Sequence, residues 1–485
     1  MQKTNIVAKI VEQRKLDIKN KGFNFGHSVP VERKRPIVPF MQSKGVILEV
    51  KRASPSKGDI APDLNAVETA LTYRKNGAKA ISCLTEENYF KGSLSDLINI
   101  CNQVLDIAVL RKDFLLEEEE IEISYCCGAD AVLLISGILS REKLISMAGK
   151  CASLGIRALV EVRTQEDAYK AIEAHKAYPE TIVFGVNSRN LKDFSIDLLA
   201  PAMLKQELGG KVIFESGICT TEASRLIAQM GFTGLLLGEF AARNPSKAVE
   251  FVKAFCNGSE APNLSADFNL KLALKIKKHQ TDAKKNKRPM VKICGLTRGQ
   301  DIDLAVKFGA DFIGFIFAPG FERSVYGQRF DTIKEKLSSY TDVVKVAVIT
   351  DTESSEAKYA IQMVKDGVLD CLQFHGLSYN NIRAELLSLP HYFAATDSAS
   401  IDASAIRTLS DYGEARILQD CKGHEYCKQV PLWIAGGITV ENVQNLIQTY
   451  NPELIDISGG IESNSSQKGI KDEQLLEKLF NLIEN

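Results

Sequence analysis

The sequence predicts an α/β protein with two eight-stranded parallel barrels in tandem. Three observations support this prediction: short apolar runs alternate with helical patterns, the whole arrangement occurs twice, and a polar, lysine-rich stretch separates the two copies. The chain has 485 residues. This length is enough for two barrels, because one barrel domain typically takes about 250 residues.

Apolar runs divide the first half of the chain into eight repeating units. The runs are rich in Val, Ile and Leu and mostly continuous, which is typical of strands that are buried on both faces. Helical patterns lie between them, for example at 165–175 and 221–231. The predicted strands are 45–50, 79–84, 107–114, 130–136, 157–162, 181–187, 211–216 and 233–238. We therefore place the first barrel at residues 1–256.

The composition changes over residues 257–289. This stretch begins with NGSEAPNLS and continues with the basic run KIKKHQTDAKKNKRP. One interpretation is an arm that binds phosphate or RNA. The interpretation that we favour is a solvated basic linker with a helical start.

The pattern of apolar runs then restarts, with eight more predicted strands. The last two runs of this half end in small residues at the same spacing as their counterparts in the first half. The predicted strands are 290–295, 312–317, 343–349, 371–376, 392–396, 415–420, 432–437 and 454–460. The second barrel is expected at 290–485, so the fold class is two tandem (β/α)8 TIM barrels.

Charge and composition exclude several classes of function. Lys and Arg number 60 and Asp and Glu 61, giving a formal net charge of −1, so no nucleic-acid partner is expected. No apolar run approaches the roughly 20 residues that cross a bilayer, and the beginning, MQKTNIVAKIVEQRK, has no signal-peptide stretch. The 11 cysteines form no Cys-x-x-Cys pair, so we expect no metal site. We expect a cytoplasmic monomer without a membrane partner.

Charged and polar residues end most of the predicted strands of the first half. Glu49 and Lys51 are two positions apart and therefore share a face. A charge inside a closed barrel is costly unless it is paired, and the chemistry of such barrels lies at the C-terminal ends of the strands. We therefore expect one polar site rather than separate charges that point to water. Its candidate members are Glu49, Lys51, Lys112, Glu161, Asn187, Arg189 and Glu215.

Small residues end the last two predicted strands of this half, at Ser216, Gly217 and Gly238. In many barrels this quadrant binds phosphate on backbone N–H groups and a helix N-terminus. Glycine allows the anion to approach the backbone closely. Glu239 follows directly, and we expect only its backbone N–H to contribute, because its carboxylate would repel the anion.

Residues 51–58, KRASPSKG, closely resemble the signature that follows the first strand in the indole-3-glycerol-phosphate synthase family. Further segments match that family in order and spacing, and the similarity covers residues 3–255. These segments are 84–93, 112–114, 161–162, 187–191 and 215–217.

The resemblance implies a fold and an activity for the first half. Members of that family close the indole ring of 1-(2-carboxyphenylamino)-1-deoxyribulose 5-phosphate and release CO₂ and water. By this resemblance Lys112 is the general acid, Glu161 the general base and Lys51 the partner of the anthranilate carboxylate. We expect other cations near Lys112 to lower its pKa. Orienting roles fall to Glu49, Asn187, Arg189 and Glu215, and substrate binding to Ser54, Lys57, Phe90, Ser216, Gly217, Gly238 and Glu239.

The second half resembles the phosphoribosylanthranilate isomerase family through VKICGLT at 291–297 and through matches at 373–376, 435–438 and 456–462. The similarity covers residues 290–482. That family carries out an Amadori rearrangement, which opens the ribosylamine ring and moves a proton from C2′. The resemblance makes Cys294 the general base, its pKa lowered by helix N-termini and arginine, and Asp420 the general acid. The implied substrate-binding residues are Arg323, for the anthranilate carboxylate, and Gln373, His375, Gly436, Gly437, Ser458 and Gly459.

The second half departs from its family in two places. Phe321 stands where a serine is usual, two positions before Arg323. The segment after Asp420 runs almost directly into the next strand and lacks the glycine-rich lid of the family. We therefore expect a missing or rebuilt lid and a following helix of a single turn.

Together the two resemblances predict a bifunctional, cofactor-independent enzyme of tryptophan biosynthesis with phosphorylated small-molecule substrates. In a first alternative, only the N-terminal barrel is catalytic and the C-terminal barrel is a structural partner. A second alternative is a sugar-phosphate aldolase with a Schiff base on Lys112 or Lys51. A non-enzymatic binding module predicts fewer ionisable residues at strand ends than the sequence has.

Overall fold

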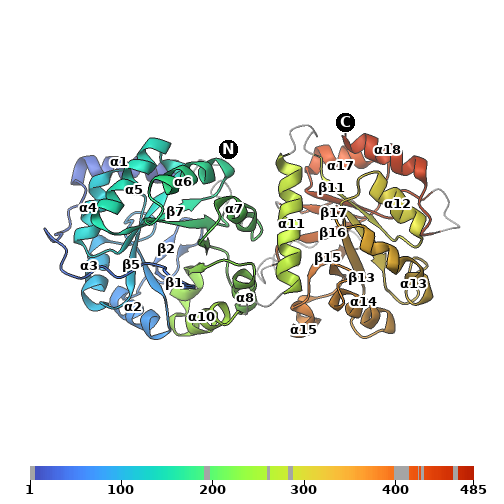
Figure 1. Cartoon of the computed structure of the whole chain (residues 1–485), viewed down its shortest axis with the longest axis horizontal. Helices are drawn as coiled ribbons and strands as arrows, with labels where there is room; N and C mark the ends of the chain where they lie inside the picture. Colours follow the sequence, from blue (N-terminus) through green and yellow to red (C-terminus); the bar gives the residue numbers. More distant parts are fainter. Residues whose placement is uncertain are drawn as a thin grey trace. The chain divides into compact units, whose positions relative to one another are not determined.

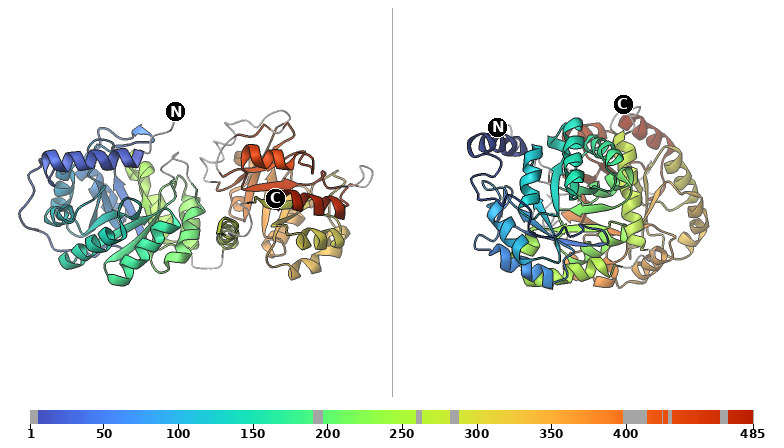
Figure 2. Two further views of the ribbon diagram at one scale, coloured as in Figure 1. Left: turned by 90° about the horizontal axis from the view of Figure 1, so that it is seen from above. Right: turned by 60° about the vertical axis from the view of Figure 1, so that its left-hand side comes forward.

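The computed structural model describes residues 6–189, 197–258, 263–281, 288–397, 414–423, 425–427, 431–462 and 468–484. The chain divides into two compact units, Met1–Ala261 and Pro262–Asn485. Each unit contains one closed barrel of eight parallel strands with helices around it (Figures 1 and 2). The predicted fold class of two tandem (β/α)8 barrels is thereby confirmed.

The sheet of the first unit closes because β1 is hydrogen-bonded to both β4 and β10. The remaining strands follow one another around the barrel in chain order. A small antiparallel hairpin, β2 (Ala53–Ser54) and β3 (Gly58–Asp59), comes directly after β1. The barrel strands are β1 (Gly45–Val50), β4 (Ala80–Leu84), β5 (Ala108–Lys112), β6 (Ala131–Ile135), β7 (Arg157–Val162), β8 (Ile182–Asn187), β9 (Val212–Glu215) and β10 (Gly234–Leu237).

Side-chain caps fix the start of several helices around this barrel. Ser93, Ser140 and Thr220 each accept a hydrogen bond from a backbone N–H three residues later, and Thr164 forms a capping box with Asp167. Two short 3₁₀ turns lie at Ser136–Ile138 and Pro245–Lys247. The helices are α1 (Ile6–Lys21), α2 (Ala66–Lys75), α3 (Leu94–Gln103), α4 (Glu118–Cys126), α5 (Arg141–Leu154), α6 (Gln165–Ala177), α7 (Ala200–Leu208), α8 (Thr221–Gln229), α9 (Glu239–Arg243) and α10 (Ala248–Cys256).

The segment that leads into β1 packs against the first barrel on the side of the strands' N-terminal ends. Phe40 and Met41 are buried and belong to the cluster of apolar side chains inside the barrel. Asp130, directly before β6, pairs with Arg33 at 2.6 Å and with Arg35 at 3.3 Å. The opposite ends of the strands carry the predicted site residues.

The sheet of the second unit closes in the same way, with β11 hydrogen-bonded to both β12 and β18. Outward-facing strand side chains such as Val291, Ile293 and Phe315 form one apolar core with the surrounding helices. The strands are β11 (Met290–Cys294), β12 (Phe312–Ile316), β13 (Val344–Ile349), β14 (Cys371–His375), β15 (His391–Asp397), β16 (Ile417–Cys421), β17 (Trp433–Ala435) and β18 (Leu454–Ile457).

Helices also surround this second sheet. Short 3₁₀ turns lie at Glu335–Ser339 and Tyr379–Asn381. The helices in the described ranges are α11 (Leu264–Thr281), α12 (Gly299–Lys307), α13 (Gln328–Lys334), α14 (Ser355–Lys365), α15 (Ala384–Leu387), α17 (Val443–Tyr450) and α18 (Glu473–Glu484). None of the helices in the described part of the chain combines the length and the apolar character of a membrane span.

Helix α11 occupies much of the stretch 257–289, which we expected to be a basic linker with a helical start. Its residues Phe268, Leu272 and Ile276 are at most 5% exposed. Their spacing of four places them on one side of the helix, which therefore packs within the second unit. Lys271 pairs with Asp370, directly before β14, at 3.0 Å.

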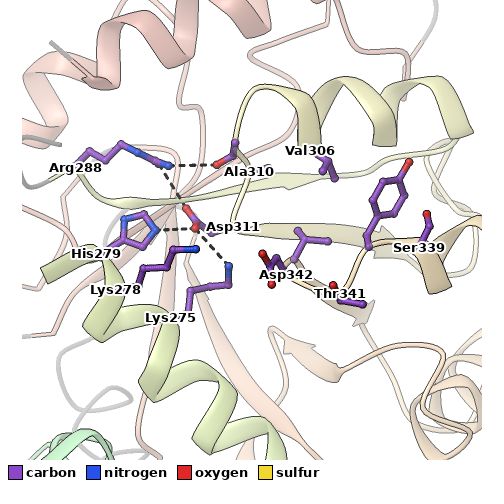
Figure 3. Close-up of a pocket in the computed structure, with 13 residues that line it drawn as sticks. Lys275, Lys278, His279, Arg288, Val306, Ala310, Asp311, Ser339, Thr341 and Asp342 are labelled. Carbon is purple, nitrogen blue, oxygen red and sulfur yellow. Dashed lines mark hydrogen bonds and ion pairs between the residues drawn. The ribbon is translucent and has the colours of Figure 1, made fainter. Parts of the chain in front are cut away.

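A cavity of about 460 Å³ lies between α11 and the N-terminal ends of β11, β12 and β13. Figure 3 shows His279, Lys275 and Arg288 directed at Asp311 from different sides, at 2.7, 3.6 and 3.5 Å. Asp311 also accepts the backbone N–H of Val291 at 3.0 Å. These three side chains therefore tie the lead-in segment to the barrel, at the end opposite the predicted site residues.

Candidate active sites

Lys112 lies among three carboxylates at the C-terminal ends of the first barrel's strands. Its Nζ is 3.0 Å from Glu215 Oε2 and 3.8 Å from both Glu49 Oε2 and Glu161 Oε2. The three glutamates come from β9, β1 and β7, and each is at most 2% exposed. The fold thus brings together residues that are far apart in the sequence.

The charge environment of Lys112 differs from our expectation of neighbouring cations. Burial opposes the charge on its amine, but Glu215, Glu49 and Glu161 outweigh burial and raise the pKa of Lys112. The expected lowering of this pKa is wrong, because the nearest charges around the closed barrel are carboxylates. Lys112 is therefore an ammonium ion at neutral pH, able to donate a proton and to stabilise negative charge.

The carboxylates around Lys112 differ in their affinity for protons. Burial and the neighbouring charge of Glu161 raise the pKa of Glu215 to about 7, although Lys112 opposes this effect. Burial also acts on Glu161, but Arg163, 2.5 Å away, and Lys112 outweigh it and lower the pKa of Glu161. Since two close buried carboxylates resist simultaneous ionisation, Glu215 holds the proton of this pair.

Lys51 lies beside the same cluster. Its Nζ is 3.3 Å from Glu49 Oε1 and 5.5 Å from the centre of the Phe90 ring. The loop that carries Phe90 is fixed by the buried Glu86, which accepts backbone hydrogen bonds from Asn88 and from the two residues after it. An ammonium group next to an aromatic ring suits a substrate that joins a carboxylate to an aromatic ring.

The SPSKG segment forms the tip of the β2–β3 hairpin. Ser54 is buried and Lys57 is exposed at the tip. Arg189 Nη1 lies 3.5 Å from Ser56 Oγ, which links the hairpin to the segment after β8. Asn187 donates to Glu161 at 3.2 Å.

The predicted phosphate quadrant contains a turn with left-handed backbone angles. Ser216 and Gly217 both have positive φ angles, of 74° and 79°. Gly238 directly precedes α9, and the Glu239 carboxylate lies 3.5 Å from Arg243. A Cβ at position 238 would lie 2.7 Å from Glu49 Oε1, so this glycine also makes room for the charged cluster.

Three further residues shape this site, and sequence reasoning assigned no role to two of them, Ser82 and Gly185. Arg163 pairs with Glu161, and Ser82 donates to Glu49 Oε2 at 3.3 Å. A Cβ at Gly185 would lie 2.2 Å from Glu215 Oε1. A glycine within the apolar strand run 181–187 was the available signal, because it marks a position where another group comes close to the backbone.

In the second barrel Cys294 ends β11 and is buried. Burial raises the pKa of its thiol, and the charges of Lys292 and Lys471 offset only part of this effect. The expected lowering of this pKa is therefore wrong. The thiol is neutral at pH 7, so it must lose its proton before it can act as a base.

Asp420 on β16 faces His375, which ends β14, with 3.8 Å between Oδ2 and Nε2. Burial raises the pKa of Asp420 even though His375 opposes it, and burial lowers the pKa of His375. The amide of Gln373 lies 3.1 Å from His375 Nδ1. A carboxyl group that holds its proton can act as a general acid.

A buried ion pair, not found by sequence reasoning, lies behind these groups. Lys292, two residues before Cys294, is fully buried, with its Nζ 2.6 Å from Asp456 Oδ2 and 2.5 Å from Gln373 Oε1. The hydroxyl of Tyr392 donates to the same Gln373 oxygen at 2.8 Å. The signal was a lysine inside the apolar run MVKIC.

Two turns and one arginine complete the second site. Gly436 and Gly437 have φ angles of 96° and 63°, and the Oγ of Ser458 is buried without a hydrogen-bond partner among the described residues. Arg323 is not free: its Nε and Nη2 bind the carboxylate of Glu462 at 2.9 and 2.7 Å. A Cβ at Gly459 would lie 3.2 Å from Arg323 Nη2, so the arginine passes close to this turn.

The described part of the connection between β16 and β17 contains no helix. Cys427 N–H donates to the side chain of Gln419 at 2.8 Å, and Tyr426 donates to the carbonyl of Ala435 at 2.7 Å. The short connection is thus attached to the barrel. Phe321, the other departure from the family, is 55% exposed.

Both sites lie at the C-terminal ends of parallel strands and pair proton-transfer groups with glycine-rich turns, which defines a class of barrel enzymes. A family model described as indole-3-glycerol phosphate synthase matches residues 7–254, and one described as N-(5'-phosphoribosyl)anthranilate isomerase matches residues 291–482. The chain belongs to the indole-3-glycerol phosphate synthase family and carries the isomerase domain in tandem with it.

Individual relatives agree with this assignment. A multifunctional tryptophan biosynthesis protein of Schizosaccharomyces pombe is 32% identical over 88% of this chain and 58% of its own length. An indole-3-glycerol phosphate synthase of Oceanobacillus iheyensis is 34% identical over 50% of this chain and 94% of its own length. One of Carboxydothermus hydrogenoformans is 39% identical over 43% of this chain and 79% of its own length. The chain thus spans 58% of the length of the S. pombe protein that matches both halves.

Proposed function

We propose that the chain is a bifunctional enzyme of tryptophan biosynthesis. Its second barrel isomerises N-(5-phosphoribosyl)anthranilate to 1-(2-carboxyphenylamino)-1-deoxyribulose 5-phosphate. Its first barrel cyclises, decarboxylates and dehydrates that product to indole-3-glycerol phosphate. The observation that carries the proposal is Lys112 among Glu215, Glu49 and Glu161 at the strand ends. Both substrates are small phosphorylated molecules, and we propose a cytoplasmic monomer that needs no cofactor.

In the synthase barrel, Lys51 pairs with the anthranilate carboxylate. Attack of the aromatic carbon on the substrate's ketone builds negative charge on oxygen, and Lys112 protonates that oxygen. CO₂ then leaves, and Lys112, reprotonated from solvent, donates a second proton so that the hydroxyl leaves as water. Glu161 takes the proton that is released last. The turns at Ser216–Gly217 and Gly238–Glu239 offer backbone N–H groups to the phosphate.

In the isomerase barrel, Asp420 donates a proton to the ring oxygen of the ribosylamine, which opens the ring. Cys294 removes the proton from C2′. Arg323 binds the anthranilate carboxylate, and the turns at Gly436–Gly437 and Ser458–Gly459 bind the phosphate. The raised pKa of Asp420 supports the acid role, because the carboxyl group must hold its proton before the reaction starts.

Complementation of two auxotrophs, one lacking each activity, tests this function directly. The full chain is expected to restore growth of both strains. Rescue of only the synthase-deficient strain would favour the alternative in which the second barrel is a structural partner. Two observations favour that alternative: the connection after β16 is short, and Glu462 already binds Arg323. Borohydride trapping of an adduct on Lys112 or Lys51 would instead favour an aldolase.

A further inference from the structure

Arg323, Glu462 and Lys471 form an ion-pair triad at the C-terminal ends of β12 and β18. Glu462 Oε1 accepts from Arg323 Nε, Lys471 Nζ and the backbone N–H of Gly469, at 2.9, 2.9 and 3.0 Å. The side chain of Lys471 is fully buried and that of Glu462 is 5% exposed. Lys471 and Gly469 thus hold the Glu462 carboxylate in place, and this carboxylate in turn binds Arg323.

The contact with Glu462 uses one particular edge of the Arg323 guanidinium. Nε donates to Oε1 at 2.9 Å and Nη2 donates to Oε2 at 2.7 Å, which is a bidentate pair on the side of the group. A guanidinium has five N–H donors, so the outer edge formed by Nη1 and the second N–H of Nη2 keeps a matching pair of donors. That outer edge has the geometry to bind a second carboxylate in the same bidentate way.

The same triad reaches the predicted phosphate turn. Lys471 Nζ donates to the carbonyl of Ser458 at 2.9 Å. The guanidinium passes close to that turn, since a Cβ at Gly459 would lie 3.2 Å from Arg323 Nη2, and one at Gly295 would lie 2.8 Å from Arg323 Cδ. The triad thus links the arginine to this turn, beside a site for a substrate with two anionic groups.

We propose that Glu462 and Lys471 are positioning residues of the isomerase site. Glu462 orients Arg323 so that its outer edge meets the anthranilate carboxylate, and Lys471 holds both Glu462 and the Ser458–Gly459 turn. The triad therefore sets the distance between the carboxylate and phosphate ends of the substrate. This inference rests on the isomerase function proposed above.

Glu462→Gln is the first test, in the full chain. Gln can accept from one donor of Arg323 but presents N–H groups to the other, so the outer edge loses its orientation. We expect the isomerase KM and the inhibition constant of free anthranilate to rise about tenfold, the equivalent of one charge-assisted hydrogen bond. The inhibition constant of inorganic phosphate and the synthase activity of the same polypeptide are expected to stay unchanged.

Glu322→Gln is the matched control. Glu322 adjoins Arg323 in sequence, pairs with Lys468 at 3.2 Å and is 67% exposed. Glu322→Gln removes one negative charge near the arginine but leaves the triad intact. The isomerase KM and both inhibition constants should therefore stay within about twofold of the wild-type values. If Glu462→Gln yields no folded protein, Glu462→Asp keeps the charge but shortens the side chain, and the same selective loss of anthranilate affinity is expected.

A double-mutant cycle separates positioning from general stabilisation. If Glu462 acts through Arg323, then Glu462→Gln should have little further effect on anthranilate affinity in an Arg323→Lys background. Additive effects of the two substitutions would overturn the proposal.

Lys471→Met is the second arm, because it removes the donor to both Glu462 and the phosphate turn. Here the inhibition constants of anthranilate and of inorganic phosphate are both expected to rise. A wild-type chain without isomerase turnover would refute the proposed function itself. A wild-type chain that turns over, together with unchanged anthranilate inhibition in Glu462→Gln, would refute only the positioning role.

Discussion

In the first barrel the groups proposed to act on substrate already touch one another, whereas in the second barrel they are held by other partners or are uncharged. Lys112 is an ammonium ion, with the carboxyl group of Glu215 3.0 Å away and the carboxylates of Glu49 and Glu161 at 3.8 Å. Cys294 and Asp420, by contrast, both have pKa values raised by burial, which keeps the thiol neutral and favours the protonated form of the Asp420 carboxyl group. The same barrel fold can therefore hold its proposed catalytic groups either in charged or in neutral form before the reaction. The side chains that surround each catalytic group decide which form it takes.

The largest effect that tests this contrast is expected for Lys112→Met. Loss of the ammonium removes both the proton donor and the charge that stabilises the developing oxyanion, so synthase kcat/KM should fall by about 10³-fold or more. Isomerase turnover of the same chain should not change. Lys150→Met is the control, since Lys150 lies on the outer helix α5 and pairs with Glu122. Loss of both activities in a folded Lys112→Met protein would show that the two sites are not independent.

Cys294→Ala should lower isomerase turnover by about 10²- to 10⁴-fold and leave the synthase intact, because it removes the proposed base. Cys371→Ala is the matched control: Cys371 is also a buried cysteine on a strand of the second barrel. Steady-state assays of both reactions provide the measurement. Equal loss in the two variants would assign Cys294 a packing role only.

Gly185→Ala tests whether the first barrel depends on the exact positions of Lys112 and its glutamates. It changes none of these residues and adds only a methyl group beside them. The added Cβ would meet Glu215 Oε1 at 2.2 Å, so the carboxylate must move away from Lys112. Since small displacements of catalytic groups are costly, we expect synthase kcat to fall by about 10- to 100-fold. Gly137→Ala in the same unit, where a Cβ would make an ordinary contact of 3.4 Å with Asp167, should change it little.

The smallest expected effect concerns pH. Glu215 has a pKa of about 7 in the folded barrel against an ordinary value of 4.5, so the folded state holds this proton longer than the unfolded chain does. Its contribution to stability is therefore complete below about pH 4.5 and is lost as the pH rises to about 7. Glu215→Gln should remove this dependence and raise the thermal midpoint of the first barrel by about 2–4 °C above pH 7. Midpoints of both proteins that fall in parallel from pH 4.5 to 8 would contradict the raised pKa.

The sequence was sufficient to predict the strands but not the charges that surround the site residues. Val- and Ile-rich runs such as 45–50 and 157–162 coincide with β1 and β7, because strands buried on both faces need continuous apolar residues. The surroundings of Lys112 depend on which strand ends meet across the closed barrel, and no local pattern encodes this. The lysine-rich composition of 257–289 likewise obscured the four-residue spacing of the buried side chains in α11.

Each barrel is preceded by its own lead-in segment, anchored to an aspartate directly before a strand: Asp130 in the first unit and Asp311 in the second. The boundary between the two compact units accordingly lies upstream of α11. A fragment that begins at 290 would expose the apolar side of the barrel under Phe268, Leu272 and Ile276 and leave Asp311 and Asp370 without their α11 partners. A fragment of the downstream half should therefore keep this helix.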